Sequence, residues 1–153
     1  MSTPEARLEA LGIALPEPMA PVANYVPFVI SGSQLFVSGQ VSLLDGAMIT
    51  GRVGETMALP AAQQAARACG INLIAQCKSA LGELSRVRRV VKLGGFVNAA
   101  PDFVDIPLVV NGCSDLMVEV FGEAGRHARS AVACPTLPRG VAVEVDGIFE
   151  IDA

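Results

Sequence analysis

The sequence predicts an α+β domain in which two long helices cover one face of a mixed β-sheet. The first observation is the order of the predicted elements, which is strands, helix, strand, helix and strands. The second is apolar spacing typical of helices in two segments, 60–84 and 107–122. The third is a closing segment, 141–151, in which valines alternate with small or acidic residues. The opposite sheet face is then apolar and open, which predicts an oligomer that closes over it.

Length and composition narrow the classes of function. The 153 residues suffice for one domain with a proper core. Apolar residues make up 52% of the chain and charged residues 17%, a balance that favours burial of some surface against another subunit. The net charge is −4 without a basic stripe, which argues against nucleic acid as a partner. No apolar run approaches the roughly 18 residues needed to cross a bilayer, and the polar start is unlike a signal peptide.

The cysteines indicate a compartment rather than a metal site. The four cysteines form no CxxC pair and the chain has one histidine, so we expect no structural zinc. Cys69, Cys77 and Cys113 fall inside helical patterns, where cysteine acts as a small core hydrophobe. A reducing cytoplasm is the simplest location for such a protein.

Residues 1–20 read as a short helix followed by a proline-rich lead, and residues 21–153 as the domain itself. Ser2 or Thr3 can cap a helix over residues 3–12, with Pro4 in its first turn. The lead is too rich in proline for regular structure, so we expect it to run over the surface of the domain.

The next segments predict the first strands. Residues 22–31 have strand composition, and Pro27 places that strand at an edge or a bulge. A second strand follows at 34–38, and Asp45-Gly46 is a strong hairpin signal before a return strand over 47–52.

Glycines interrupt the middle of the chain at positions that call for close packing. Gly70 lies within the helix predicted over 60–84, where we expect it to pack against the sheet. Gly94-Gly95 lies within the strand predicted over 86–98 and indicates a bulge or the close approach of another backbone. The second helix then presents a buried stripe, which consists of Val109, Cys113, Leu116, Met117 and Val120.

Two strands, 130–134 and 141–151, close the chain and carry the residues with the most chemistry. Arg129 enters the first strand and Glu144 lies midway along the second. If the two strands lie in one sheet, a guanidinium and a carboxylate can approach the same small volume. Arginine binds a carboxylate through two parallel hydrogen bonds, and a nearby glutamate can hold or activate a water. The alternative is an ordinary salt bridge between Arg129 and Glu144.

Several short motifs together resemble a known family. They are Val-Ser-Gly-Gln at 37–40, Gly-Phe-Val-Asn at 95–98 before Pro-Asp-Phe at 101–103, Ala-Arg-Ser at 128–130, Leu137-Pro138 and Val-Glu-Val at 143–145. The combination resembles the Rid family of reactive-intermediate (enamine/imine) deaminases, also called YjgF-like and long labelled L-PSP endoribonucleases. The run at 111–130 resembles one particular branch of it. The resemblance extends from about residue 21 to residue 151.

The resemblance implies a chorismate-mutase-like fold and a homotrimer, in which three sheets face inward as a barrel and ligand clefts lie between subunits. It implies that Arg129 grips a substrate carboxylate and that Glu144 positions the attacking water. It also implies no cofactor, because an imine is already electrophilic.

Five further residues match the family's cleft. By resemblance, Gly39, next to Ser38, supplies a backbone contact, and Tyr25 lines the cleft across a subunit boundary. Phe96 and Asn98 lie near the expected cleft wall.

One position departs from the family pattern. Better-characterised deaminases of the family carry a cysteine two residues after the arginine, and here that position is Ala131. The loss puts substrate identity in doubt more than carboxylate binding, because the backbone amide at 131 remains. Cys134 does not replace that thiol by position, and we expect His127 to be structural rather than a catalytic base.

These observations favour an enzyme that hydrolyses small carboxylate-bearing enamines or imines, such as 2-aminoacrylate, to a 2-oxo acid and ammonia. The alternative is a non-catalytic protein that binds a small carboxylate or keto acid at trimer clefts, where Arg129 is needed and Glu144 is not. An endoribonuclease is the weakest hypothesis, given the acidic balance and the single histidine.

Overall fold

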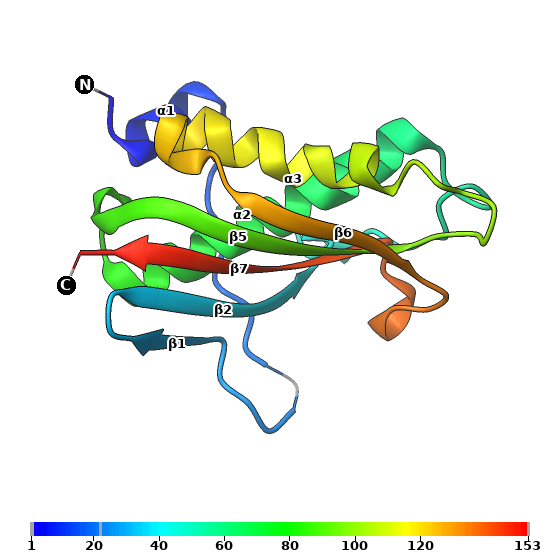
Figure 1. Ribbon diagram of the computed structural model, residues 1–153, viewed down its shortest axis with the longest axis horizontal. Coiled ribbons are helices and arrows are strands. Elements are labelled where there is room, and N and C mark those ends of the chain that lie inside the picture. Colours follow the sequence, from blue (N-terminus) through cyan, green and yellow to red (C-terminus); the bar gives the residue numbers. More distant parts are fainter. Residues whose placement is uncertain (1, 22, 153) are drawn as a thin grey trace.

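A five-stranded sheet with helices on one side forms the body of the protein. The computed structural model describes residues 2–21 and 23–152. The sheet order is β1-β2-β7-β5-β6, and Figure 1 shows α2 passing behind these strands. The strands are β1 (Phe28–Ser31), β2 (Gln34–Val41), β5 (Val87–Asn98), β6 (Ala128–Cys134) and β7 (Val143–Ile151), with a separate hairpin of β3 (Leu43–Leu44) and β4 (Ala47–Met48). The helices are α1 (Pro4–Ala10), α2 (Leu59–Leu81) and α3 (Ile106–Phe121).

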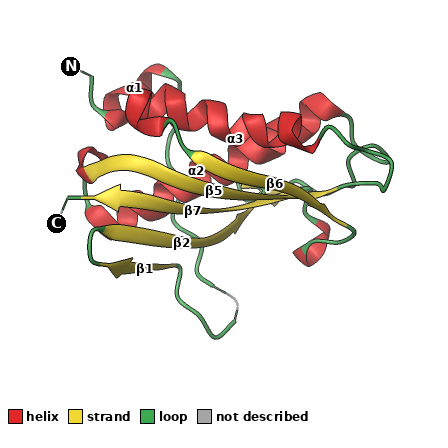
Figure 2. Cartoon of the chain, in the orientation of Figure 1, coloured by secondary structure: helices red, strands yellow, loops and turns green. Residues whose placement is uncertain are grey.

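The sheet is mixed, as predicted. Strands β5 and β6 run parallel, and the other neighbours in the sheet are antiparallel. Helix α2 packs on β2 and β7, and α3 packs on β5 and β6, so both long helices lie on the same face (Figure 2). The five residues of the stripe predicted in the second helix are all buried. The predicted α+β architecture is therefore confirmed. No helix among the described residues is long and apolar enough to cross a membrane.

The two long helices approach each other closely at glycines. A Cβ on Gly70 would lie 3.0 Å from Leu116 Cδ2 and 3.1 Å from Cys113 Sγ, both on α3. A Cβ on Gly112 would collide with the backbone carbonyl of Gln63 on α2. The expectation that Gly70 packs against the sheet was therefore wrong. It packs against the second helix, because small residues let helix backbones approach.

The N-terminal half follows the predictions with shorter elements. Thr3 caps α1, since its side chain accepts a hydrogen bond from the Ala6 amide at 3.1 Å. Of the strand predicted over 22–31, only β1 forms, at the sheet edge directly after Pro27, and Val22 lies outside the described residues. Asp45 and Gly46 adopt φ values of 51° and 78°, as a two-residue hairpin turn requires. The return strand ends at Met48 rather than at residue 52.

The glycine pair in β5 does not mark a bulge. Gly94 and Gly95 keep regular register with β7, and the register shifts in β5 occur before Lys92. A Cβ on Gly94 would meet the Asp146 carboxylate, and one on Gly95 would lie 2.8 Å from Val110 Cγ1. Neighbouring side chains on both faces therefore explain the glycines. A bulge occurs instead in β2, between Val37 and Gln40.

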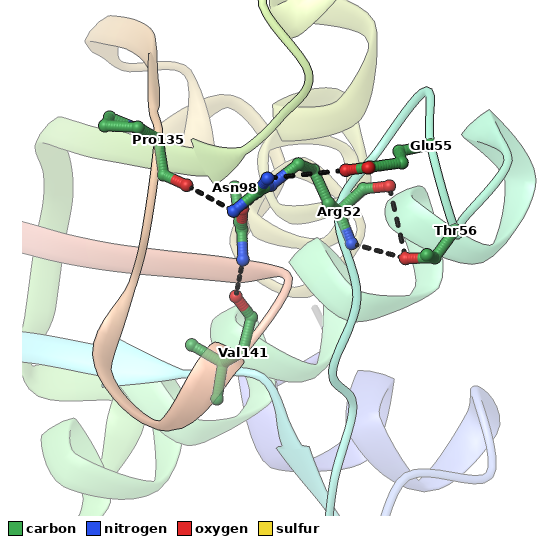
Figure 3. Close-up of polar contacts among 6 residues, drawn as sticks. All are labelled: Arg52, Glu55, Thr56, Asn98, Pro135 and Val141. Carbon is green, nitrogen blue, oxygen red and sulfur yellow. Dashed lines mark hydrogen bonds and ion pairs between the residues drawn. The ribbon is translucent and has the colours of Figure 1, made fainter.

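A polar hub around Arg52 joins three segments at one end of the sheet (Figure 3). The guanidinium donates to Asn98 Oδ1 at 3.2 Å, to the Pro135 carbonyl at 2.8 Å and to Glu55 Oε2 at 3.4 Å. Asn98 is only 5% exposed, and its amide donates to the Val141 carbonyl at 3.3 Å. The hub therefore fixes the loop between β6 and β7.

We expect Arg52→Met to lower the free energy of unfolding by about 1–3 kcal/mol, because it leaves the buried Asn98 oxygen without a donor. Urea denaturation measures the effect. The matched control is Arg88→Met at an exposed arginine of β5, which should stay within about 0.5 kcal/mol of the wild type. Equal stability of the two variants would contradict a structural role for the hub.

Candidate functional site

A cavity of about 570 Å³ opens at one end of the sheet. Its walls come from the proline-rich lead, the bulge of β2, Met48 of β4, the loop before β7 and Glu144 of β7. Within the lead, Met19, Ala20 and Pro21 line the cavity. The sequence predicted that the lead runs over the surface of the domain. The lead also forms one wall of this cavity.

Strand alternation places Glu144 at this cavity. Val143 and Val145 are buried in the core against the helices, so the side chain between them projects from the opposite face. The bulge in β2 brings Gly39 against it, and a Cβ on Gly39 would lie 2.5 Å from Glu144 Oε2. Gly39 was predicted to admit a ligand close to the backbone. Here the group that approaches is the carboxylate of Glu144.

The environment of Glu144 disfavours its charged form. Burial raises the pKa of the Glu144 carboxyl above its usual value, and the negative charge of Asp146 raises it further. Among residues 2–21 and 23–152, no ion pair or hydrogen bond reaches this carboxylate. A half-buried acid with a raised pKa and no partner, facing a cavity, is typical of a functional group rather than of a structural one.

Two other predicted residues line the same cavity. The Ser38 hydroxyl donates to the Val26 carbonyl at 2.8 Å, and the Ser38 amide donates to the Pro27 carbonyl at 2.9 Å. These bonds hold residues 26 and 27, which follow the lead, against the bulge. Tyr25, between the lead and β1, lines the cavity and keeps 49% of its surface exposed.

A cation that sequence analysis missed also lines this cavity. Arg139 follows Pro138 and has φ 57° and ψ 18°, a left-handed conformation that non-glycine residues seldom adopt. Such backbone strain concentrates at functional sites. The sequence signal was Pro-Arg-Gly at 138–140, shortly before β7. This is a turn in which an arginine adopts a backbone conformation that favours glycine.

Arg129 lies on the other side of the sheet. Its guanidinium donates to Ser114 Oγ at 3.0 Å and to the Pro107 carbonyl at 3.1 Å, both on α3. Strand β5 separates β6 from β7. The expectation that Arg129 and Glu144 approach one small volume was therefore wrong within a single chain. No salt bridge joins them among the described residues either, so that alternative also fails.

The remaining predicted residues divide between the two faces. Phe96 on β5 is the register partner of Glu144 on the neighbouring strand β7, and the two side chains lie on the same face of the sheet. Asn98 is committed to Arg52 and the Val141 carbonyl. Ala131 packs against the core on the helix side, the face that Arg129 uses. Cys134 is half-buried on β6, and no three His, Cys, Asp or Glu residues cluster as metal ligands in the described part of the chain.

Comparisons with known proteins agree with this fold over nearly the whole chain. The curated protein TCP17 of Trypanosoma cruzi is 50% identical over 96% of this chain and 93% of its own length. The crystal structure of Atu1372, a protein of unknown function from Agrobacterium tumefaciens, has a TM-score of 0.92 and 50% identity, covering 97% of this chain and 92% of that one. A "putative endoribonuclease" of Shewanella oneidensis MR-1 has a TM-score of 0.95 and 40% identity, covering 98% and 100%.

A family model described as "YjgF/chorismate mutase-like, putative endoribonuclease" matches residues 5–148. That range spans α1, the whole sheet up to the middle of β7, and both long helices. The chain therefore belongs to the YjgF/chorismate-mutase-like family.

Proposed function

We propose that the protein hydrolyses small imines and enamines that carry a carboxylate, such as 2-aminoacrylate, to a 2-oxo acid and ammonia. The observation that carries the proposal is Glu144, a half-buried carboxylate without a partner among the described residues, beside a cavity large enough for such a molecule. A carboxylate whose pKa is raised is a stronger base, which suits it to taking a proton from water.

The chemistry needs one water and one base. The ionised Glu144 accepts a proton from water as the water oxygen bonds to the carbon of the protonated imine. The product is a carbinolamine. Glu144 passes the proton to the carbinolamine nitrogen, the C–N bond breaks to release ammonia, and the hydroxyl proton passes to ammonia as the C=O bond of the 2-oxo acid forms, which leaves Glu144 ionised. Gly39 allows the carboxylate to lie against the strand backbone, so the water can sit on the cavity side.

A guanidinium is needed to bind the substrate carboxylate. Arg139 is the cation that the same chain supplies to the cavity. We also assign Arg129 to substrate binding, but from a neighbouring copy of the chain. In its own chain Arg129 faces α3, away from Glu144. A homotrimer with clefts between subunits, as the resemblance implies, is part of this proposal.

The family description also contains an endoribonuclease label, which the cavity favours less. Of the described residues that line it, Arg139 is the only cation. Proteins that bind RNA strands use several cations along the backbone. His127, the one histidine, lies on the opposite face against α3.

We expect the wild type to accelerate the decay of 2-aminoacrylate generated in situ, followed by absorbance and by the 2-oxo acid formed. Glu144→Gln should lower kcat by about 10²–10⁴ with little change in KM, because it removes the base and keeps the shape. Arg129→Lys and Arg139→Gln should each raise KM if that residue binds the carboxylate, since neither presents the guanidinium fork.

Arg88→Gln, at an exposed arginine of β5, is the matched control and should leave both constants unchanged. Decay no faster than in buffer would overturn the deaminase. If the 2-oxo acid still bound under those conditions, the protein would be a small-carboxylate binder, for which Glu144 is dispensable.

Asp146 offers a second test through pH. The charge of Asp146 contributes to the raised pKa of Glu144, and activity requires ionised Glu144. Activity should therefore rise with pH through that raised pKa. In Asp146→Asn the neighbouring charge is gone, the pKa of Glu144 falls, and the acidic limb of the kcat profile should move to lower pH. An unmoved limb would mean that another group controls it.

A further inference from the structure

A second groove, which is open to solvent, lies on the helix side of the sheet between α3 and β6, with a volume of about 630 Å³. Ser114 of α3, His127 and Arg129 all line it. The deaminase proposal uses only Arg129 among them. Sequence analysis took His127 to be structural, and Ser114 was not singled out.

The three side chains form one directed chain of hydrogen bonds. His127 Nδ1 lies 2.6 Å from the Gly125 carbonyl, which only accepts, so Nδ1 carries the proton. Nε2 of the neutral ring is then an acceptor, and Ser114 Oγ, at 2.9 Å, donates its proton to it. Arg129 Nη1 donates to the same Oγ at 3.0 Å. The hydroxyl is therefore polarised from both sides.

This arrangement matches the geometry of an activated nucleophile. Such a site needs a nucleophile and a base within hydrogen-bond reach, and a third group that orients the base. Ser114, His127 and the Gly125 carbonyl take these three roles. Arg129 adds a positive charge where the oxygen becomes negative. It engages two of its five N–H donors with Ser114 and Pro107, which leaves three without a partner among the described residues.

We propose that Ser114 and His127 are a nucleophile–base pair that hydrolyses small carboxylic esters in this groove. Ser114 Oγ bonds to the ester carbonyl carbon as its proton passes to His127 Nε2. The C–O bond to the alcohol then breaks, and His127 returns the proton to the leaving alcohol. His127 then takes a proton from water as the water oxygen bonds to the acyl carbon, the bond from that carbon to Ser114 Oγ breaks, and His127 returns the proton to Oγ as the acid leaves.

Arg129 stabilises the negative carbonyl oxygen in both steps. Ser114 lies in the middle of α3, where its backbone N–H belongs to the helix. A side-chain donor must therefore take the place of the backbone donors that usually hold an oxyanion. The free donors of Arg129 are next to Ser114 Oγ and meet this need.

The rival explanation is that the same bonds only tie β6 to α3. The two explanations differ in the reactivity of the serine. A serine with an oriented base reacts with electrophiles about 10²–10⁴-fold faster than an ordinary surface serine, whereas a structural hydroxyl does not.

Labelling with phenylmethanesulfonyl fluoride tests this on the full chain. We expect one adduct per chain, located at Ser114 by peptide mapping, and a burst of one equivalent of nitrophenolate from p-nitrophenyl acetate. His127→Gln should slow both reactions at least about 10-fold, because the amide can accept the bond but cannot take the proton.

Ser130→Ala is the matched control, since Ser130 is exposed on the other side of β6, and it should label like the wild type. The wild-type experiment needs no variant to fold. No adduct, or adducts spread over exposed serines, would overturn the proposal. The assay contains no imine, so its outcome is independent of the proposed deaminase.

Discussion

The alternation of side chains along the strands is the constraint on which the rest of the structure depends. Val143 and Val145 must enter the core beneath the helices, so Glu144 and Asp146 project from the opposite face. The same rule turns Arg129 toward α3. Because β5 lies between β6 and β7, one chain presents its carboxylate and this guanidinium on opposite sides of the sheet. A reaction that uses both requires two copies of the chain.

The environment of Glu144 is unfavourable to a charge, and several features maintain it. The bulge of β2 presents Gly39 to the carboxylate, and Ser38 in the same bulge binds the carbonyls of Val26 and Pro27. Arg52 binds the Pro135 carbonyl and so fixes the loop between β6 and β7. Arg139, which adopts a left-handed conformation, lies in this loop. An acid held half-buried without a partner lowers stability. Unfavourable features such as this acid and the left-handed backbone of Arg139 concentrate at functional sites. Both lie at the same end of the sheet, beside the cavity.

Family membership determines the fold here more firmly than the reaction. Relatives at 40–50% identity share the whole architecture, yet function resides in the side chains that a fold presents. This chain presents two candidate sets, Glu144 with Arg139 on one face and Ser114 with His127 on the other. The two sets differ in chemistry. The first offers a carboxylate base, and the second offers a hydroxyl that is hydrogen-bonded to an imidazole base.

The sequence by itself determined the elements, because helical and strand periodicity record which side of each segment is buried. The stripe of α3, the Asp45-Gly46 turn and the alternation of β7 all follow from local pattern. Only the tertiary structure decided which residues from distant parts of the chain contact one another. Gly70 faces a helix rather than the sheet, Asn98 is committed to Arg52, and Arg129 faces Ser114 rather than Glu144. Each of these contacts joins residues that lie far apart in the chain, so local spacing does not encode it.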